Sequence, residues 1–160
     1  MIEETVFFQN LRDSGIALQE SDVAAFEREL GSPLPADYRV FLLRRNGGRF
    51  DRPVLFQLPT DEYSDRMGLF NVYGLLRPPG GNHNDLRHNL EVHRGRIPRG
   101  TLPIADDGDN LLLLGLEGDR RGKLYLWIRD DEMMKDVEEN QILAADSFAE
   151  MASNTRPYDR

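Results

Sequence analysis

Apolar residues are most concentrated between positions 101 and 131, in an otherwise polar chain. Two short apolar runs, residues 111–114 and 123–128, flank a glycine-containing loop that can adopt the positive φ angles of a chain reversal. In the second run, aliphatic residues alternate with Tyr125 and Trp127, so neither face of the strand is polar. The pattern predicts an antiparallel hairpin that is covered on both faces and lies in the middle of a sheet.

Helical patterns lie near both ends of the chain. Ser21 has the chemistry of an N-cap, and apolar residues follow it at helical spacing as far as Gly31, which suits a left-handed C-terminal stop. Pro35 suits the start of the next helix, because the first turn does not use its missing N–H. Ser147 and Glu150 form a capping-box pattern that predicts a short C-terminal helix.

The segments between these helices have shorter periods. Strands are predicted for residues 54–58, 67–73 and 102–104, loops for residues 76–84 and 130–140, a helix within residues 1–14, and a short helix after Asp85.

The size and composition of the chain indicate one soluble domain over residues 1–160. A chain of 160 residues, 39% hydrophobic and 30% charged, is long enough for one hydrophobic core and short for two. No apolar run approaches the roughly 20 residues that span a bilayer, and the N-terminus has no signal-peptide pattern. The chain has no cysteine, which excludes disulfides and a cysteine nucleophile and suits a reducing cytosol. We therefore predict a cytoplasmic protein with no membrane partner.

The charge balance favours a basic partner over nucleic acid. Twenty basic residues against 28 acidic ones give a net charge of −8, which opposes binding to phosphate backbones. Acidic residues are dense between positions 130 and 139, where they are Asp130, Asp131, Glu132, Asp136, Glu138 and Glu139. Such a segment either keeps a loop soluble or speeds the encounter with a basic protein, and the sequence leaves both readings open.

The cluster Asp106, Asp107, Asp109 and Asn110 is the most site-like group of side chains. Its oxygens suit Ca²⁺ or Mg²⁺, but the spacing does not match a calcium loop, and Asp and Asn also favour tight turns. His83, His88 and His93 would point in different directions from a helix, because successive rings would lie about 140° apart. No nucleophile elbow or phosphate-binding loop is present. We predict no bound metal, no cofactor and no enzymatic activity.

Three separated segments together carry a family resemblance. The first, residues 23–50, contains Leu34-Pro35-Ala36-Asp37-Tyr38 and Asn46-Gly47-Gly48. The second, residues 101–131, has a short strand, an Asp/Gly-rich turn, an apolar strand, and a strand that ends in aromatic and acidic residues. The third is Ser147-Phe148 at the start of the last helix. In this order, over about residues 20–50 and 100–152, they resemble the SUKH superfamily, which includes fungal cell-wall-assembly regulators; residues 59–100 match no family pattern.

The resemblance implies an α+β domain in which a mainly antiparallel sheet packs against N-terminal and C-terminal helices. It also implies that the protein works by binding. Bacterial members are largely immunity proteins that neutralise a toxin domain, commonly a nuclease or deaminase, whereas the fungal relatives suggest a regulatory or scaffold domain that binds an endogenous protein.

We predict an immunity protein that occludes a basic toxin domain, with the regulatory domain as the alternative. The expected contacts are acidic side chains together with exposed aromatic anchors. These candidate partner-binding residues are Asp106, Asp107, Asp109, Asp130, Asp131, Glu132, Tyr63 and Tyr73.

Overall fold

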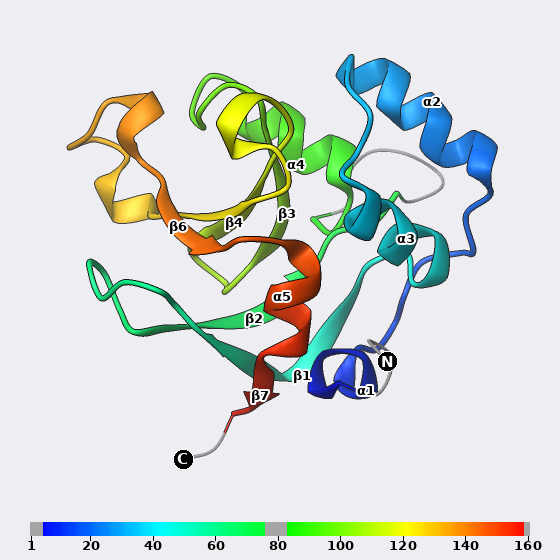
Figure 1. Cartoon of the computed structure of the whole chain (residues 1–160), viewed down its shortest axis with the longest axis horizontal. Helices are drawn as coiled ribbons and strands as arrows, with labels where there is room; N and C mark the ends of the chain where they lie inside the picture. Colours follow the sequence, from blue (N-terminus) through cyan, green and yellow to red (C-terminus); the bar gives the residue numbers. More distant parts are fainter. Residues whose placement is uncertain (1–4, 76–82, 159–160) are drawn as a thin grey trace.

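The computed structural model describes residues 5–75 and 83–158, and these form an α+β domain (Figure 1). In chain order the elements are α1 (Val6–Asn10), α2 (Glu20–Leu30), α3 (Ala36–Arg44), β1 (Gly48–Gln57), β2 (Arg66–Val72), α4 (Leu86–His93), β3 (Thr101–Asp106), β4 (Leu111–Gly115), β5 (Leu124–Trp127), β6 (Ile142–Ala145), α5 (Phe148–Ser153) and β7 (Thr155–Pro157). Short 3-10 turns occupy Gly118–Arg120, Arg129–Asp131 and Val137–Glu139.

All strands of the described part belong to one antiparallel sheet of seven, in the order β6-β5-β4-β3-β2-β1-β7. Figure 1 shows the sheet curling so that its two ends lie on either side of α5. The first helix, α1, packs against α5, β1 and β7, whereas α4 packs against β3. The predicted arrangement, an antiparallel sheet packed against N-terminal and C-terminal helices, is confirmed.

Both strands of the β4–β5 hairpin are internal strands of this sheet, as the apolar pattern predicted, although β3 and not the hairpin is the middle strand. Leu112 and Leu126 face each other across the pair and belong to the main core, which also contains the side chains of α1, α2, α3 and α5. Leu111 pairs with Trp127 on the opposite face, where a smaller apolar cluster contains both residues. Both faces of the hairpin are therefore buried, because the main core covers one face, and α4 with the segment after it covers the other.

The predicted helix ends are mostly confirmed. Gly31 has a left-handed conformation, with a φ of 76°, directly after α2. The hydroxyl of Ser147 accepts the backbone N–H of Glu150 at 3.0 Å, which caps α5. The prediction of Ser21 as an N-cap is wrong, because α2 already begins at Glu20. The Asp22 carboxylate accepts the N–H of Gln19 at 2.8 Å and so fixes the first turn earlier.

Two strands at the edges of the sheet were not predicted. Strand β6 has only four residues and β7 only three, with a proline as its last residue.

The predicted loop at residues 130–140 is confirmed, with two 3-10 turns at its ends. Residues 76–82 of the predicted loop at 76–84 lie outside the described residues. Within the described ranges, none of the helices has the length and apolar character needed to cross a bilayer.

Candidate partner-binding surface

The turn between β3 and β4 is built from its own acidic side chains. One carboxylate oxygen of Asp107 accepts the backbone N–H groups of Asp109, at 2.9 Å, and of Asn110, at 2.6 Å. The Asp106 carboxylate accepts the N–H of Gly108 at 2.9 Å, and that glycine has a φ of 98°. Asp residues commonly close tight turns in this way. Asp106 and Asp107 therefore have a structural role, because each directs one carboxylate oxygen at the backbone of the turn.

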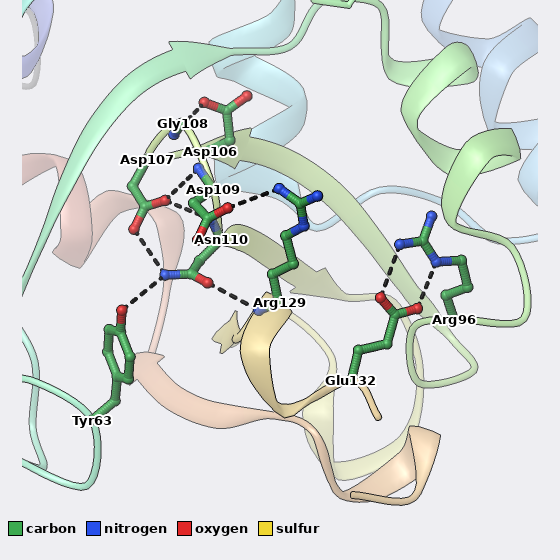
Figure 2. A network of polar contacts seen from close by, with 9 residues as sticks. All are labelled: Tyr63, Arg96, Asp106, Asp107, Gly108, Asp109, Asn110, Arg129 and Glu132. Atoms are coloured by element: carbon green, nitrogen blue, oxygen red, sulfur yellow. Dashed lines mark hydrogen bonds and ion pairs between the residues drawn. The ribbon is translucent and has the colours of Figure 1, made fainter. Parts of the chain in front are cut away.

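Asn110 ties this turn to two other parts of the chain (Figure 2). Its buried amide nitrogen donates to Asp107, at 3.2 Å, and to the hydroxyl of Tyr63, at 3.3 Å, in the loop between β1 and β2. Its carbonyl oxygen accepts the backbone N–H of Arg129 at 2.9 Å. We call the surface made by Tyr63, Asp107, Asp109, Asn110 and Arg129 the turn surface. Three segments far apart in sequence meet there around one buried amide.

The turn surface combines an exposed aromatic ring with an exposed ion pair. Tyr63 is 53% exposed, as predicted for an aromatic contact residue. Arg129 donates to the carboxylate of Asp109 at 3.0 Å, and both side chains are open to solvent. Phe70 on β2, also exposed, lies beside Gly108 of the same turn. Exposed aromatic side chains beside charged groups are typical of protein contact surfaces.

Tyr73 contradicts the expectation that it is an exposed anchor. Its side chain is 1% exposed, and its hydroxyl donates to Asp106 at 2.6 Å. Burial raises the pKa of the Tyr73 hydroxyl well above its usual value, and the neighbouring carboxylate raises the pKa further. Asn71 donates to the other oxygen of Asp106 at 3.0 Å. Both oxygens of Asp106 are thus occupied by internal partners, which makes it a positioning residue for the turn.

The segment of residues 129–140, which we call the acidic loop, begins at the turn surface and leads to β6 (Figure 1). Arg96 makes a two-pronged contact with Glu132, at 2.6 and 2.9 Å. These hydrogen bonds lower the pKa of the Glu132 carboxyl, although burial opposes the shift. Asp131 pairs with Lys135 at 3.3 Å, whereas Asp130 is exposed and has no ion pair within the described part of the chain. The predicted acidic residues therefore differ in whether a nearby cation compensates their negative charge.

Within residues 5–75 and 83–158, the side chains that commonly bind metal ions are not gathered into a site. In these ranges, no group of three or more His, Cys, Asp or Glu side chains is placed to hold a metal ion. The His83 and His88 rings lie 6.0 Å apart, whereas His93 packs against Trp127. The three histidines therefore do not converge.

A groove of about 480 Å³ lies between α2 and α4, and the sequence patterns did not predict it. In it, Arg87 makes two hydrogen bonds of 2.8 Å to Glu29, and its guanidinium lies 5.4 Å from the centre of the Phe26 ring. The lining carries both signs of charge, with Glu91 and Arg94 on the same rim. Only the packing of two helices brings these residues together.

Comparison with known proteins places most of the chain in one family. A relative from Bacillus subtilis (strain 168), described as an SPbeta prophage-derived uncharacterized protein YokK, is 27% identical over 139 residues, which cover 78% of this chain and 67% of the relative. The model of the SMI1 / KNR4 family (SUKH-1) matches residues 17–154, from just before α2 to the end of α5. The chain therefore belongs to the SMI1 / KNR4 family (SUKH-1).

Proposed function

We propose that this protein is a non-enzymatic immunity protein that binds a basic toxin domain, such as a nuclease or deaminase, and blocks it by occlusion. The observation that carries the proposal is the turn surface, where the buried amide of Asn110 joins the exposed Tyr63 to the turn that displays the exposed Asp109 carboxylate. The net charge of −8 favours a basic partner, and the prophage origin of one relative suits a gene that takes part in conflict between bacteria.

The proposed mechanism needs no chemical step. An enzyme that acts on nucleic acid has a basic cleft for phosphate groups, and an acidic protein surface can cover that cleft. The hydrogen bonds of Asn110 fix the relative positions of Tyr63 and the β3–β4 turn before any partner arrives. Because the surface is preorganised, little conformational entropy is lost on binding. Charge attraction should mainly increase the association rate and should weaken as salt is added.

The test is co-expression with the toxin domain encoded by the neighbouring reading frame. We expect cells that carry both genes to grow, whereas cells that carry the toxin and an empty vector do not. Equal killing in both strains would refute the immunity function. If affinity capture from cells recovers a resident protein and the chain gives no protection, the regulatory or scaffold alternative is favoured.

Binding measurements with the purified toxin domain locate the contact. Asp109→Lys should lower the affinity about tenfold, mainly through slower association, because it reverses a charge on the turn surface. Asp51→Lys is the matched control, since Asp51 also forms an exposed ion pair with an arginine, Arg49, but on β1. Tyr63→Ala should weaken binding more than Tyr158→Ala, which removes another exposed tyrosine. Equal effects of the test and control variants would exclude the turn surface as the contact.

A further inference from the structure

The acidic loop exposes two adjacent methionines whose side chains are not packed in the hydrophobic core. Met133 is 91% exposed and Met134 is 81% exposed, which are the highest values among the large hydrophobic residues of the described part. Val137, in the same loop, is also exposed. Burial of a methionine side chain stabilises a folded state, and this protein gains little of that stabilisation from either residue. Single exposed apolar residues are common, but a group of them on one loop indicates a contact.

The base of the acidic loop is closed by a side-chain amide that bonds both backbone polar groups of one residue, as a paired strand would. The buried Asn140 donates from its amide nitrogen to the carbonyl oxygen of Ile128 at 2.9 Å. Its amide oxygen accepts the N–H of Ile128 at 3.2 Å. These two bonds hold the start and the end of the loop together.

The arms of the loop are fixed on both sides of the methionines. Before them, Glu132 is held by the two hydrogen bonds from Arg96, whose carbonyl oxygen accepts the indole N–H of Trp127 at 3.1 Å. After them, Glu138 accepts the backbone N–H of Arg99 at 2.9 Å. The methionines are therefore displayed by an ordered loop, so that binding a partner costs less backbone entropy than it would for a flexible loop.

Unpaired negative charges flank the methionines in the sequence of the loop. The loop has six carboxylates and two cations, so it carries a net charge of −4 out of −8 for the whole chain. Asp131 and Glu132 are compensated by Lys135 and Arg96. Asp130, Asp136 and Glu139 are exposed and have no ion pair to any described residue. The exposed methionines, which we call the tip, therefore lie in the chain between exposed carboxylates, which we call the acidic rim.

We propose that the Met133–Met134 tip inserts into an apolar pocket of a protein partner whose rim is rich in lysine or arginine. This inference rests on the proposed function and names the element that enters the toxin domain. Methionine suits the task, because its flexible, polarisable side chain adapts to irregular pockets. A second copy of this chain is disfavoured as the occupant, because it would bring an identical acidic rim. An anionic membrane is disfavoured for the same reason.

The first experiment measures binding of the toxin domain to the double variant Met133→Ala, Met134→Ala. We expect affinity to fall between about tenfold and a hundredfold, mainly through faster dissociation, because apolar anchors at a contact centre control the lifetime of the complex. The unfolding midpoint should not change. The control Ile16→Ala, Val92→Ala removes two exposed aliphatic side chains from other places and should change affinity less than about twofold. Met133→Leu, Met134→Leu should retain most of the affinity.

Unchanged affinity and protection with the alanine double variant would refute this inference and leave the proposed function intact. If the unmodified chain does not bind the toxin domain, the proposed function fails, and a second experiment decides the inference. In that experiment, the methyl groups of the methionines are labelled with ¹³C and titrated with an amphipathic peptide of leucine and lysine. The buried Met67 and Met151 serve as internal references.

We expect the peptide to shift the Met133 and Met134 methyl signals, and we expect the shifts to shrink as salt is added. A peptide of lysine alone should shift them much less, because it offers no apolar group. Equal shifts from both peptides, or none from either, would overturn the inference. Shifts that depend on protein concentration without peptide would instead identify a second copy as the occupant, and shifts caused by phosphatidylglycerol vesicles would identify a membrane; both results contradict the proposal.

Discussion

Trp127 is the side chain whose removal tests the account of the sheet centre most directly. It is 1% exposed and lies with Ile97, Leu111 and Leu113 in the smaller apolar cluster. Truncation of a large buried aromatic residue to alanine costs about 3–5 kcal/mol, from lost burial and from the cavity that remains. The carbonyl oxygen of Arg96 also loses its indole donor, which contributes about 1 kcal/mol of that range. We therefore expect Trp127→Ala to lower the free energy of unfolding by about 3–5 kcal/mol.

The measurement is urea unfolding at 25 °C, followed by far-UV circular dichroism because Trp127 is the only tryptophan. Trp127→Phe keeps most of the apolar volume but loses the hydrogen bond, so its cost should be about 1–2 kcal/mol. This variant also provides the test if the alanine variant does not fold. A loss below about 1 kcal/mol for Trp127→Ala, with an unchanged urea dependence, would refute the argument that Trp127 stabilises the sheet centre.

Two further predictions concern other parts of the fold. Gly47→Ala should destabilise the protein by about 2 kcal/mol more than Gly95→Ala. Both glycines have a positive φ, but a Cβ at Gly47 would lie 2.6 Å from the carbonyl oxygen of Val72, whereas a Cβ at Gly95 would have no neighbour within 4 Å. Equal losses of unfolding free energy in urea would contradict this prediction. Burial lowers the pKa of His93 below its usual 6.5, so the unfolded chain binds the proton more readily and stability should fall as pH drops from 7.5 to 5.5. His93→Gln should lose less stability over that range, and identical pH dependence in both proteins would contradict the assignment.

The sequence predicted those elements whose signals are local. The β4–β5 hairpin was recognisable because two apolar runs flank a glycine-containing loop, and both faces of its second strand are apolar. Gly31 and Ser147 mark helix ends through bonds that span only a few residues. Strands β6 and β7 were missed, because four and three residues are too few to establish a period. They exist because neighbouring strands offer them hydrogen-bond partners.

The candidate site was only partly predictable for the same reason. The Asp-rich turn was visible in the sequence, but long-range contacts were not, either in the site or elsewhere in the fold, as Asn46 shows. In the sequence that residue stood out only as part of the family motif Asn46-Gly47-Gly48, yet its side-chain amide exchanges two hydrogen bonds of 2.8 Å with the backbone of Leu75 and so joins the end of α3 to the segment after β2. Tyr73 was expected to be exposed, but its ring is buried while its hydroxyl reaches Asp106. The presence of a tyrosine in the sequence does not show whether its ring is buried or exposed, because the side chain has both an apolar ring and a polar hydroxyl.

The sequence by itself determined the central hairpin, the main helices, the negative charge and the family resemblance, because each follows from neighbouring residues or from composition. The tertiary structure decided which acidic groups are available to a partner. Glu132 is compensated by an arginine 36 positions away, and Asp106 is occupied by a tyrosine 33 positions away, whereas Asp130 has no ion pair among the described residues. Such pairings depend on distances set by the folded chain, and a carboxylate's availability depends on its spatial neighbours.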